Sequence, residues 1–374
     1  MKIAAGTSKT FTAVTLCTIA ALALGGCSGS GQAAKVDLGD GPAVAGEVKK
    51  DALKGINLTF SSWGGVYQDA QLSSLEDFVT ASGARVLSDG PTEYSKVKAQ
   101  VDSGNVTWDV VDTDIIWAEM NCGEDGLFMD LNFDIVDISN IEHKELVGDC
   151  YVPAMQYGYV IMYNVDKYPT APTGWVDFFD TKKFPGKRAI AGFEDVGPGV
   201  FEGALLADGV SPDELYPLDM DRAYKKLDTI KDSFIYWKTG AESQQMIESG
   251  EADMALVWSG RGFTAEENGA NYKPIWNQAL LIADALGVPK GAKNPEASMA
   301  LINYYLGAKS QAIVTEKTAY SPVHSDSKPE LSDLGKKYLI TEPEISELII
   351  PTDTKWWAEN YDVELERWMK WLQS

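Results

Sequence analysis

Two charged side chains lie in settings where their chemistry is informative. Asp284 is the single acid in the apolar run 279–287, and Arg261 comes shortly after Trp258, the last residue of a predicted strand over 252–258. A carboxylate in such a run is paired, faces a cleft or is very costly to bury. We interpret Asp284 as a functional carboxylate. Arg261 either binds an anionic group or bridges to an acid of the chain.

An aromatic residue followed by glycines marks another candidate position. The apolar run 56–60 predicts a buried strand, and it is followed by Trp63-Gly64-Gly65 and a predicted helix over 66–82. In open α/β sheets, ligands bind where strand ends and helix starts converge. Two glycines let a ligand or a facing lobe approach the backbone. An ordinary turn with Trp63 covering the core explains the same residues.

Two further strand ends carry polar or glycine-rich residues. Asp112-Thr113-Asp114 follows the apolar run 108–111, and we expect these acids either at a cleft rim or as a cap of the next helix. Gly197-Pro198-Gly199 opens a predicted helix over 200–207. Its free amides suit an anionic group, although turn chemistry alone also explains these residues.

Strand and helix patterns alternate from residue 55 onward, which indicates α/β architecture. The chain's 374 residues are enough for two domains with buried cores. Strands are predicted over 56–60, 84–87, 108–111, 153–164, 188–191, 252–258 and 279–287, and helices over 66–82, 94–103, 115–120, 200–207, 222–230, 243–248, 295–306 and 354–372.

The composition excludes several classes of function. The net charge of −23 argues against nucleic acid and against adsorption to anionic lipid, both of which need basic patches. The two histidines, His143 and His324, are accompanied by neither a Gly-x-Ser-x-Gly nor a His-Glu-x-x-His motif. We therefore expect no catalysis, no metal and no cofactor.

The first 27 residues have the features of a leader. Lys2 and Lys9 precede an uncharged, mostly apolar stretch that ends at Cys27 in a sequence similar to the lipobox of bacterial lipoproteins. We expect residues 1–27 to be a lipoprotein signal peptide with Cys27 as the lipidation site, and residues 28–54 to be a flexible tether.

Two cysteines remain in the chain beyond the leader. In an oxidising compartment Cys122 and Cys150 are expected to form a disulfide, with two free thiols or a metal site as alternatives.

Several motifs follow one another in a specific order: the lipobox, the tether, Trp63-Gly64-Gly65, Trp108-Asp109-Val110-Val111, Gly250-Glu251-Ala252-Asp253-Met254, Val288-Pro289-Lys290-Gly291-Ala292-Lys293-Asn294 and Tyr320-Ser321-Pro322. This order resembles that of the polyamine-type (spermidine/putrescine-like) extracellular solute-binding proteins of bacterial ABC importers. The resemblance covers residue 56 to the carboxyl terminus.

The resemblance implies a two-lobed periplasmic-binding-protein-like fold of type II, with two crossing strands as the hinge. Lobe 1 would comprise residues 55–157 and 284–328, and lobe 2 residues 158–283 and 329–374. The implied role is a monomeric, lipid-anchored receptor outside the cytoplasm that passes a small amine-bearing solute to a membrane permease.

Members of this family hold amines with carboxylates and aromatic rings. The expected ligand-binding residues are Trp63, Gly64, Gly65, Asp114, Tyr157, Trp258, Arg261, Asp284, Tyr320 and Trp357. The chain departs from the family at Gly65 or Val66 and at 196–199, where acids are expected, and at Arg261, where a small residue is usual. A polyamine such as putrescine or spermidine therefore competes with a γ-aminobutyrate-like amino-carboxylate or a quaternary amine.

Overall fold

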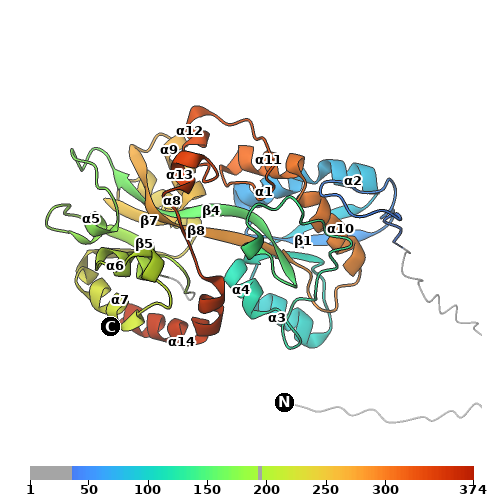
Figure 1. Cartoon of the computed structure of the whole chain (residues 1–374), viewed down its shortest axis with the longest axis horizontal. Helices are drawn as coiled ribbons and strands as arrows, with labels where there is room; N and C mark the ends of the chain where they lie inside the picture. Colours follow the sequence, from blue (N-terminus) through green and yellow to red (C-terminus); the bar gives the residue numbers. More distant parts are fainter. Residues whose placement is uncertain (1–35, 193–195) are drawn as a thin grey trace, which may run out of the picture. The chain divides into compact units, whose positions relative to one another are not determined.

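The computed structural model describes residues 36–192 and 196–374, in which strands and helices alternate along the chain (Figure 1). The strands are β1 (Asn57–Ser61), β2 (Arg85–Asp89), β3 (Val110–Asp114), β4 (Tyr151–Asn164), β5 (Arg188–Ala191), β6 (Phe234–Trp237), β7 (Met254–Trp258), β8 (Tyr272–Gly287) and β9 (Ile350–Pro351). The helices are α1 (Gly65–Ser74), α2 (Glu76–Ser82), α3 (Tyr94–Ser103), α4 (Ile115–Met120), α5 (Trp175–Phe179), α6 (Val200–Ala207), α7 (Met220–Asp228), α8 (Gly240–Glu248), α9 (Ser259–Glu267), α10 (Pro295–Tyr305), α11 (Ala308–Thr318), α12 (Asp333–Lys336), α13 (Pro343–Ser346) and α14 (Thr354–Gln373).

All the strands belong to one sheet, in the order β2-β1-β3-β8-β4-β7-β5-β6, with β9 paired to β8. The long strands β4 and β8 are antiparallel neighbours at its centre, while β1 to β3 are parallel on one side and β5 to β7 are parallel on the other. We call the part built on β1 to β3 lobe 1 and the part built on β5 to β7 lobe 2. The first twelve residues of β4 are all buried, as a near-continuous apolar run requires.

The two lobes are joined where β4 and β8 pass from one to the other. Tyr157 pairs with Ile282 and Gly158 with Leu281 at this crossing. A third passage lies beside it, because Gln156 and Ser321 exchange backbone N–H···O bonds of 3.1 and 2.8 Å. The hinge region thus contains a short extra segment in addition to the two long strands.

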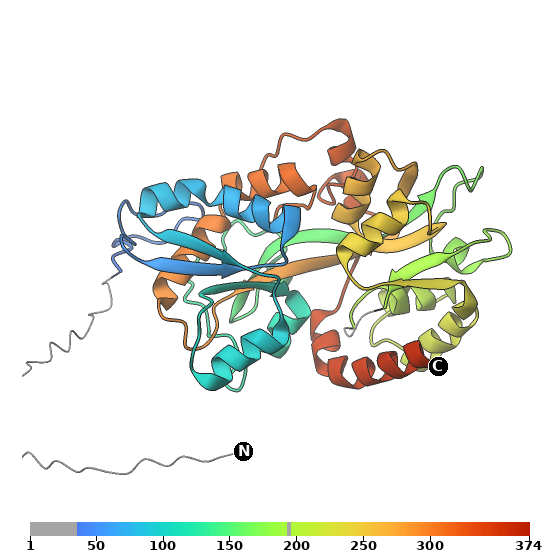
Figure 2. The same cartoon turned by 180° about the vertical axis from the view of Figure 1, so that it is seen from behind.

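Helices cover both faces of the sheet in each lobe (Figures 1 and 2). In lobe 1, α1, α2 and α11 lie on one face and α3 and α4 on the other. In lobe 2, α8 and α9 lie on one face, and α6, α7 and the C-terminal α14 lie on the other. The helix–strand alternation predicted from the sequence is therefore present, and the fold class is confirmed as a two-lobed α/β fold.

The expected tether does not extend over the whole of 28–54. Residues 36–54 pack on lobe 1: Leu53 is fully buried, and the Gly46 N–H donates to the Asn303 carbonyl at 3.0 Å. The Asn303 side chain also donates to the Val44 carbonyl at 2.9 Å. Spaced apolar residues and backbone bonds hold this segment despite its small, polar composition. The remainder of the expected tether, 28–35, and the expected signal peptide with Cys27 lie outside the described residues.

The predicted disulfide between Cys122 and Cys150 is confirmed, with Cα atoms 5.7 Å apart. It links the segment after α4 to the residue that precedes β4, in lobe 1. A bridge that closes a loop of this length stabilises a protein by roughly 3 to 4 kcal/mol in the chain-entropy picture.

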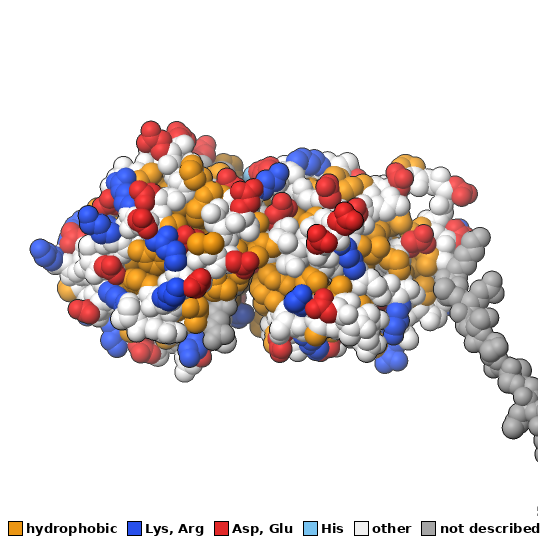
Figure 3. Space-filling model, turned by 90° about the horizontal axis from the view of Figure 1, so that it is seen from below, with side chains coloured by type: hydrophobic (Ala, Val, Ile, Leu, Met, Phe, Trp, Pro, Cys, Tyr) orange, Lys and Arg blue, Asp and Glu red, His pale blue; other side chains and the backbone are white. Residues whose placement is uncertain are grey.

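Acidic and basic side chains are scattered among hydrophobic ones over the face seen from below (Figure 3). Within residues 36–192 and 196–374, no helix combines the length and the apolar character needed to cross a membrane, and no group of three or more His, Cys, Asp or Glu side chains has the arrangement of a metal site.

Candidate functional site

A cavity of about 600 Å³ lies where the two lobes face each other. Lobe 1 contributes the turn after β1, the end of β3 and the segment before α3. Lobe 2 contributes the segments before α6, α8 and α9, and the crossing strands form the floor. The lining residues are Trp63, Gly64, Gly65, Tyr67, Pro91, Thr92, Tyr94, Asp114, Met155, Tyr157, Tyr159, Ala191, Val196, Gly197, Pro198, Val200, Phe201, Lys238, Thr239, Gly240, Ala241, Trp258, Arg261, Ile282, Asp284, Tyr320 and Trp368.

Nine of the ten expected ligand-binding residues line this cavity, and the tenth, Trp357, does not. Trp357 is fully buried in lobe 2, where its indole N–H donates to Glu202 at 2.8 Å. The prediction that Trp357 binds the ligand is therefore not supported by its position. From the same helix, Trp368 reaches the cavity instead.

The Trp63 turn places an aromatic wall on lobe 1. Gly64 and Gly65 both have positive φ angles, 75° and 61°, which explains why glycine occupies this turn. The Trp63 ring meets Tyr94 edge-on at 6.1 Å, and Tyr94 stacks on Trp117 at 4.2 Å. The Trp63 indole N–H makes no hydrogen bond of good geometry with the described residues, but it lies close enough to Asp284 to lower the pKa of that carboxyl.

Two carboxylates project from neighbouring strands on the same wall. Asp114 of β3 and Asp284 of β8 are direct partners in the antiparallel register, so both side chains lie on one face of the sheet. Asp114 also caps α4, because it accepts the Ile116 N–H at 2.7 Å. Asp114 therefore lies at the cleft and also caps a helix, which were the two alternatives predicted for the acids of Asp112-Thr113-Asp114.

Asp284 is 6% exposed, and no salt bridge joins it to any described residue. Burial raises its pKa well above the usual range, the charges of Asp112 and Asp114 add to the rise, and Trp63 opposes it. An ammonium group placed beside Asp284 would therefore favour its charged form and gain a strong charge-assisted interaction.

A second buried carboxylate, Asp112, lies behind this wall and does not line the cavity. It accepts hydrogen bonds from Tyr67 at 2.8 Å and from Gln71, and its other oxygen has no partner among the described residues. Burial raises the pKa of Asp112 to about 7, although its hydrogen-bond donors oppose this shift. Asp112 thus supports Tyr67, which reaches the cavity, and acts on Asp284 through its charge.

The lobe 2 wall carries the cationic groups. Arg261 lies in the first turn of α9, and Lys238 directly follows β6. Arg261 forms no salt bridge within the described chain, and its Nε–H is buried without a partner. A Cβ atom at Gly240 would lie 2.6 Å from this Nε, so glycine there makes room for the guanidinium. Of the two alternatives for Arg261, an ion pair with an acid of the chain is not found among the described residues.

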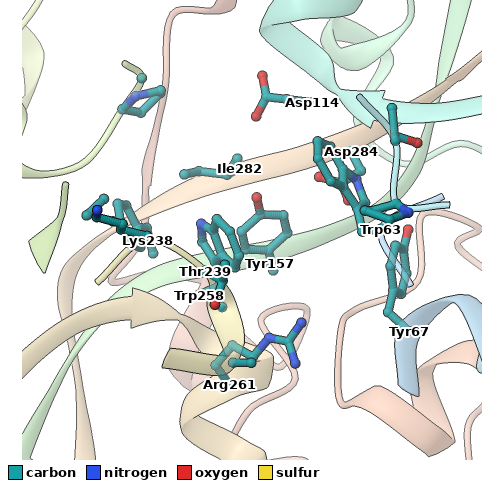
Figure 4. A pocket seen from close by; sticks show the side chains of 18 of the residues that line it. Trp63, Tyr67, Asp114, Tyr157, Lys238, Thr239, Trp258, Arg261, Ile282 and Asp284 are labelled. Atoms are coloured by element: carbon teal, nitrogen blue, oxygen red, sulfur yellow. The ribbon is translucent and has the colours of Figure 1, made fainter. Parts of the chain in front are cut away.

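Aromatic rings lie between the oppositely charged groups. In Figure 4, Trp258 and Tyr157 lie between Lys238 and Asp284, and Arg261 lies below the two rings. Tyr320 contacts both Tyr157 and Tyr67, with ring centroids 5.3 and 5.6 Å apart. Burial raises the Tyr320 pKa to about 12, while Arg261 lowers it, so this hydroxyl stays protonated and able to donate.

The Gly199 amide at the start of α6 is not free for an anionic ligand. The carboxylate of Glu202, in the first turn of the helix, accepts the Gly199 N–H at 2.7 Å. The turn interpretation of Gly197-Pro198-Gly199 is therefore correct for this amide, and these residues contribute to the cavity as a wall.

Sequence reasoning missed several lining residues, among them Tyr94, Tyr159, Phe201 and Lys238. Lys238 had a usable signal, because it is the first charged residue after the apolar stretch 234–237. The aromatic residues had none, since an aromatic inside an apolar run is more often part of a core.

Comparisons with known proteins agree with this geometry. Residues 84–339 match the family of bacterial extracellular solute-binding proteins. The chain belongs to this family. The Gamma-aminobutyric acid-binding protein of Pseudomonas aeruginosa is 29% identical over 322 residues, which is 84% of this chain and 90% of the relative. The Spermidine/putrescine-binding periplasmic protein of Escherichia coli K12 is 23% identical over 260 residues, 66% of this chain and 72% of the relative.

Solved structures of similar proteins include a GABA receptor that is 43% identical to this chain, with a TM-score of 0.78. The alignment covers 84% of this chain and 97% of the receptor chain. A periplasmic binding protein of A. tumefaciens R10, solved in complex with agropinic acid, is 33% identical to this chain, with a TM-score of 0.74. That alignment covers 86% of this chain and 99% of the other chain. This chain is accordingly the substrate-binding protein of an ABC importer, which binds a small solute and delivers it to a permease, and it is not an enzyme.

Proposed function

We propose that this receptor binds a small zwitterionic amino-carboxylate of the γ-aminobutyrate type. The observation that carries the proposal is a cavity with Asp284, which forms no ion pair with any described residue, on one wall and Arg261, whose Nε–H is buried without a partner, on the other. The ammonium group lies against Asp284, with Asp114 beside it. The carboxylate lies against Arg261, with Lys238 on the same wall.

The aromatic rings contribute to binding in two ways. Tyr157, Trp258 and Tyr320 pack along the alkyl chain and keep water from the two charged contacts, which strengthens both. The Trp63 ring offers a face to the ammonium. Two of the similar proteins named above are described as binding γ-aminobutyrate, which supports the same ligand class here.

A polyamine such as putrescine or spermidine remains the second candidate. The direct pairing of Asp114 with Asp284 puts two carboxylates on one wall, and carboxylates are what a second ammonium needs. Several relatives are spermidine/putrescine-binding proteins. Arg261 and Lys238, however, would repel a diamine that spans the cavity.

A thermal-shift screen separates these ligands. The protein is unfolded and refolded to remove bound solute, then tested against γ-aminobutyrate, putrescine, spermidine, choline and common amino acids. A ligand at 100 times its Kd adds about 2.7 kcal/mol of stability. We expect γ-aminobutyrate or a close amino-carboxylate to raise the Tm most. A response to putrescine or spermidine alone would refute the zwitterion proposal.

We further propose that the receptor is a monomer held at the outer side of the cell membrane by a lipid on Cys27, with its two lobes divided at the crossing strands. The leader sequence and its cysteine support the anchor. Labelling cells with a radioactive fatty acid, and repeating this with Cys27→Ser, tests it: the label should be lost in the variant.

A further inference from the structure

Glu202 is a fully buried carboxylate that joins three separate segments of lobe 2. It accepts the Gly199 N–H at 2.7 Å, the Tyr216 hydroxyl at 2.7 Å and the Trp357 indole N–H at 2.8 Å. Burial raises the Glu202 pKa, whereas these donors favour its charged form. A buried carboxylate with three donors is held in a single geometry, because moving it would leave several polar groups without partners.

The segment that Glu202 holds is part of the cavity wall. Residues 196–198, 200 and 201 line the cavity, and Gly199 sits among them. This wall also reaches the opposite lobe, because a Cβ atom on Gly197 would lie 3.9 Å from the Cδ1 atom of Ile116 in α4. The position of this wall segment therefore affects how completely the two lobes enclose a ligand.

Trp357 connects the same carboxylate to the C-terminal helix. It lies in the first turn of α14, and this end of α14 lies beside α4 in both views (Figures 1 and 2). Its ring also packs on Phe201, with centroids 6.0 Å apart. Trp357 thus touches the cavity wall from behind, although it does not reach the cavity.

We propose that Glu202 is a positioning residue that fixes the 196–200 wall against lobe 1 and slows the escape of bound solute, and that Trp357 acts on the solute through Glu202. This inference rests on the proposed function for its ligand. It assigns a role in ligand retention to two residues that touch no ligand.

The substitution Glu202→Gln keeps the size of the side chain but replaces one acceptor oxygen with an NH₂ group. That group must face either the Gly199 N–H or the Tyr216 and Trp357 donors, so at least one hydrogen bond is lost. With γ-aminobutyrate as the probe, we expect the dissociation rate to rise about tenfold by stopped-flow fluorescence and the association rate to change much less. Trp357→Phe, which removes one donor, should raise the dissociation rate about threefold.

The double variant tests whether Trp357 acts through Glu202. The dissociation rate of the double variant should rise by less than the product of the two single effects, because both substitutions act on one hydrogen-bonded carboxylate. Multiplied effects of the two substitutions would overturn the coupling between them.

Trp108→Phe is the matched control. Trp108 is also a buried tryptophan whose indole N–H donates to a carboxylate, that of Asp89 at 2.7 Å, but it lies in lobe 1 and does not line the cavity. It should lower the Tm comparably and leave the dissociation rate unchanged. An equal rise in dissociation rate for Trp108→Phe would show general destabilisation and overturn the proposal.

Amide exchange of the ligand-free protein gives a readout that does not depend on the ligand. In Glu202→Gln, the amides of Val196, Gly197, Gly199 and Val200 should exchange about tenfold faster than in the wild type, with other segments of lobe 2 unaffected. Unchanged exchange there would overturn the positioning role. If the wild type binds no γ-aminobutyrate, the proposed function fails, and this exchange result alone decides the role of Glu202.

Discussion

On the lobe 1 wall of the cavity, Asp114 and Asp284 project from paired strands, whereas on the lobe 2 wall Lys238 and Arg261 follow strand ends at helix starts. The acids are fixed by sheet register, and their charges act on each other through a buried region. The cations depend on the local turns and on the position of lobe 2. This difference suits the proposed ligand, which carries an ammonium at one end and a carboxylate at the other. Lobe 1 would hold the ammonium on acids that are already in place, and lobe 2 would contact the carboxylate when the two lobes close.

Of the substitutions in the two walls, one at Asp284 should weaken ligand binding most. Asp284→Asn keeps the shape of the side chain but removes the charge that holds the ammonium. We expect the Kd for γ-aminobutyrate to rise about 100-fold by isothermal titration, because charge-assisted contacts in a water-excluded site are strong. The surface variant Asp333→Asn, whose side chain is fully exposed, controls for the change in net charge. Unchanged affinity in Asp284→Asn would place the ammonium elsewhere.

The opposite wall is tested by Arg261→Met, which keeps much of the length and removes the charge. Affinity for γ-aminobutyrate should fall about 30-fold, since the ligand carboxylate loses a partner, while affinity for putrescine should rise because a repulsive charge is gone. Competition between the two ligands in one titration measures this exchange of preference. Arg222→Met, from an exposed ion pair with Asp208, is the control. A parallel loss for both ligands would mean that Arg261 supports the fold rather than selecting the ligand.

The buried acids of lobe 1 should also leave a signature in the pH dependence of stability. The Asp112 pKa is about 7 in the folded protein against an ordinary value of 3.8, so the folded state binds a proton that the unfolded state releases between these pH values. The stabilising contribution of protonated Asp112 is complete below about pH 4 and is lost as the pH rises through about 7.

Urea unfolding of the ligand-free protein at several pH values, with and without Asp112→Asn, isolates this contribution. The free energy of unfolding of the wild type should decline relative to that of the variant from pH 4 to pH 7, by at most about 1.4 kcal/mol per pH unit. A constant difference between the two proteins over this range would contradict the raised pKa.

The residues that were found from the sequence are those whose signal is local. A lone acid in an apolar run, as at Asp284, and an aromatic with glycines at a strand end, as at Trp63 and Trp258, report a cavity without knowledge of strand pairing. The opposition of Asp114 and Asp284 was not predictable in this way, because it arises from pairing between β3 and β8, far apart in the chain. The same holds for the third passage at Ser321, which pairs with Gln156.

The position of Trp357 away from the cavity has a physical explanation. Trp357 and Trp368 are eleven residues apart, about three helical turns, so they lie on nearly the same face of α14. Helical spacing therefore could not show which of them meets the cavity. That choice depends on where the helix lies along α6, whose Glu202 binds Trp357 and whose Phe201 packs against both tryptophans. The tether was predicted to run too far, to residue 54, for a similar reason: Leu53 is buried only through tertiary contacts, which the local sequence does not show.

The smallest expected effect concerns the aromatic floor between the two walls. Tyr320→Phe keeps the ring that packs on Tyr157 and Tyr67 and removes only the hydroxyl. If the ring excludes water and the hydroxyl is secondary, the Kd for γ-aminobutyrate should rise no more than about threefold, whereas Tyr320→Ala should cost more than tenfold. Isothermal titration of both variants separates packing from hydrogen bonding. Equal losses in the two would make the hydroxyl a direct ligand contact and would place the anionic end of the solute near Tyr320 as well as Arg261.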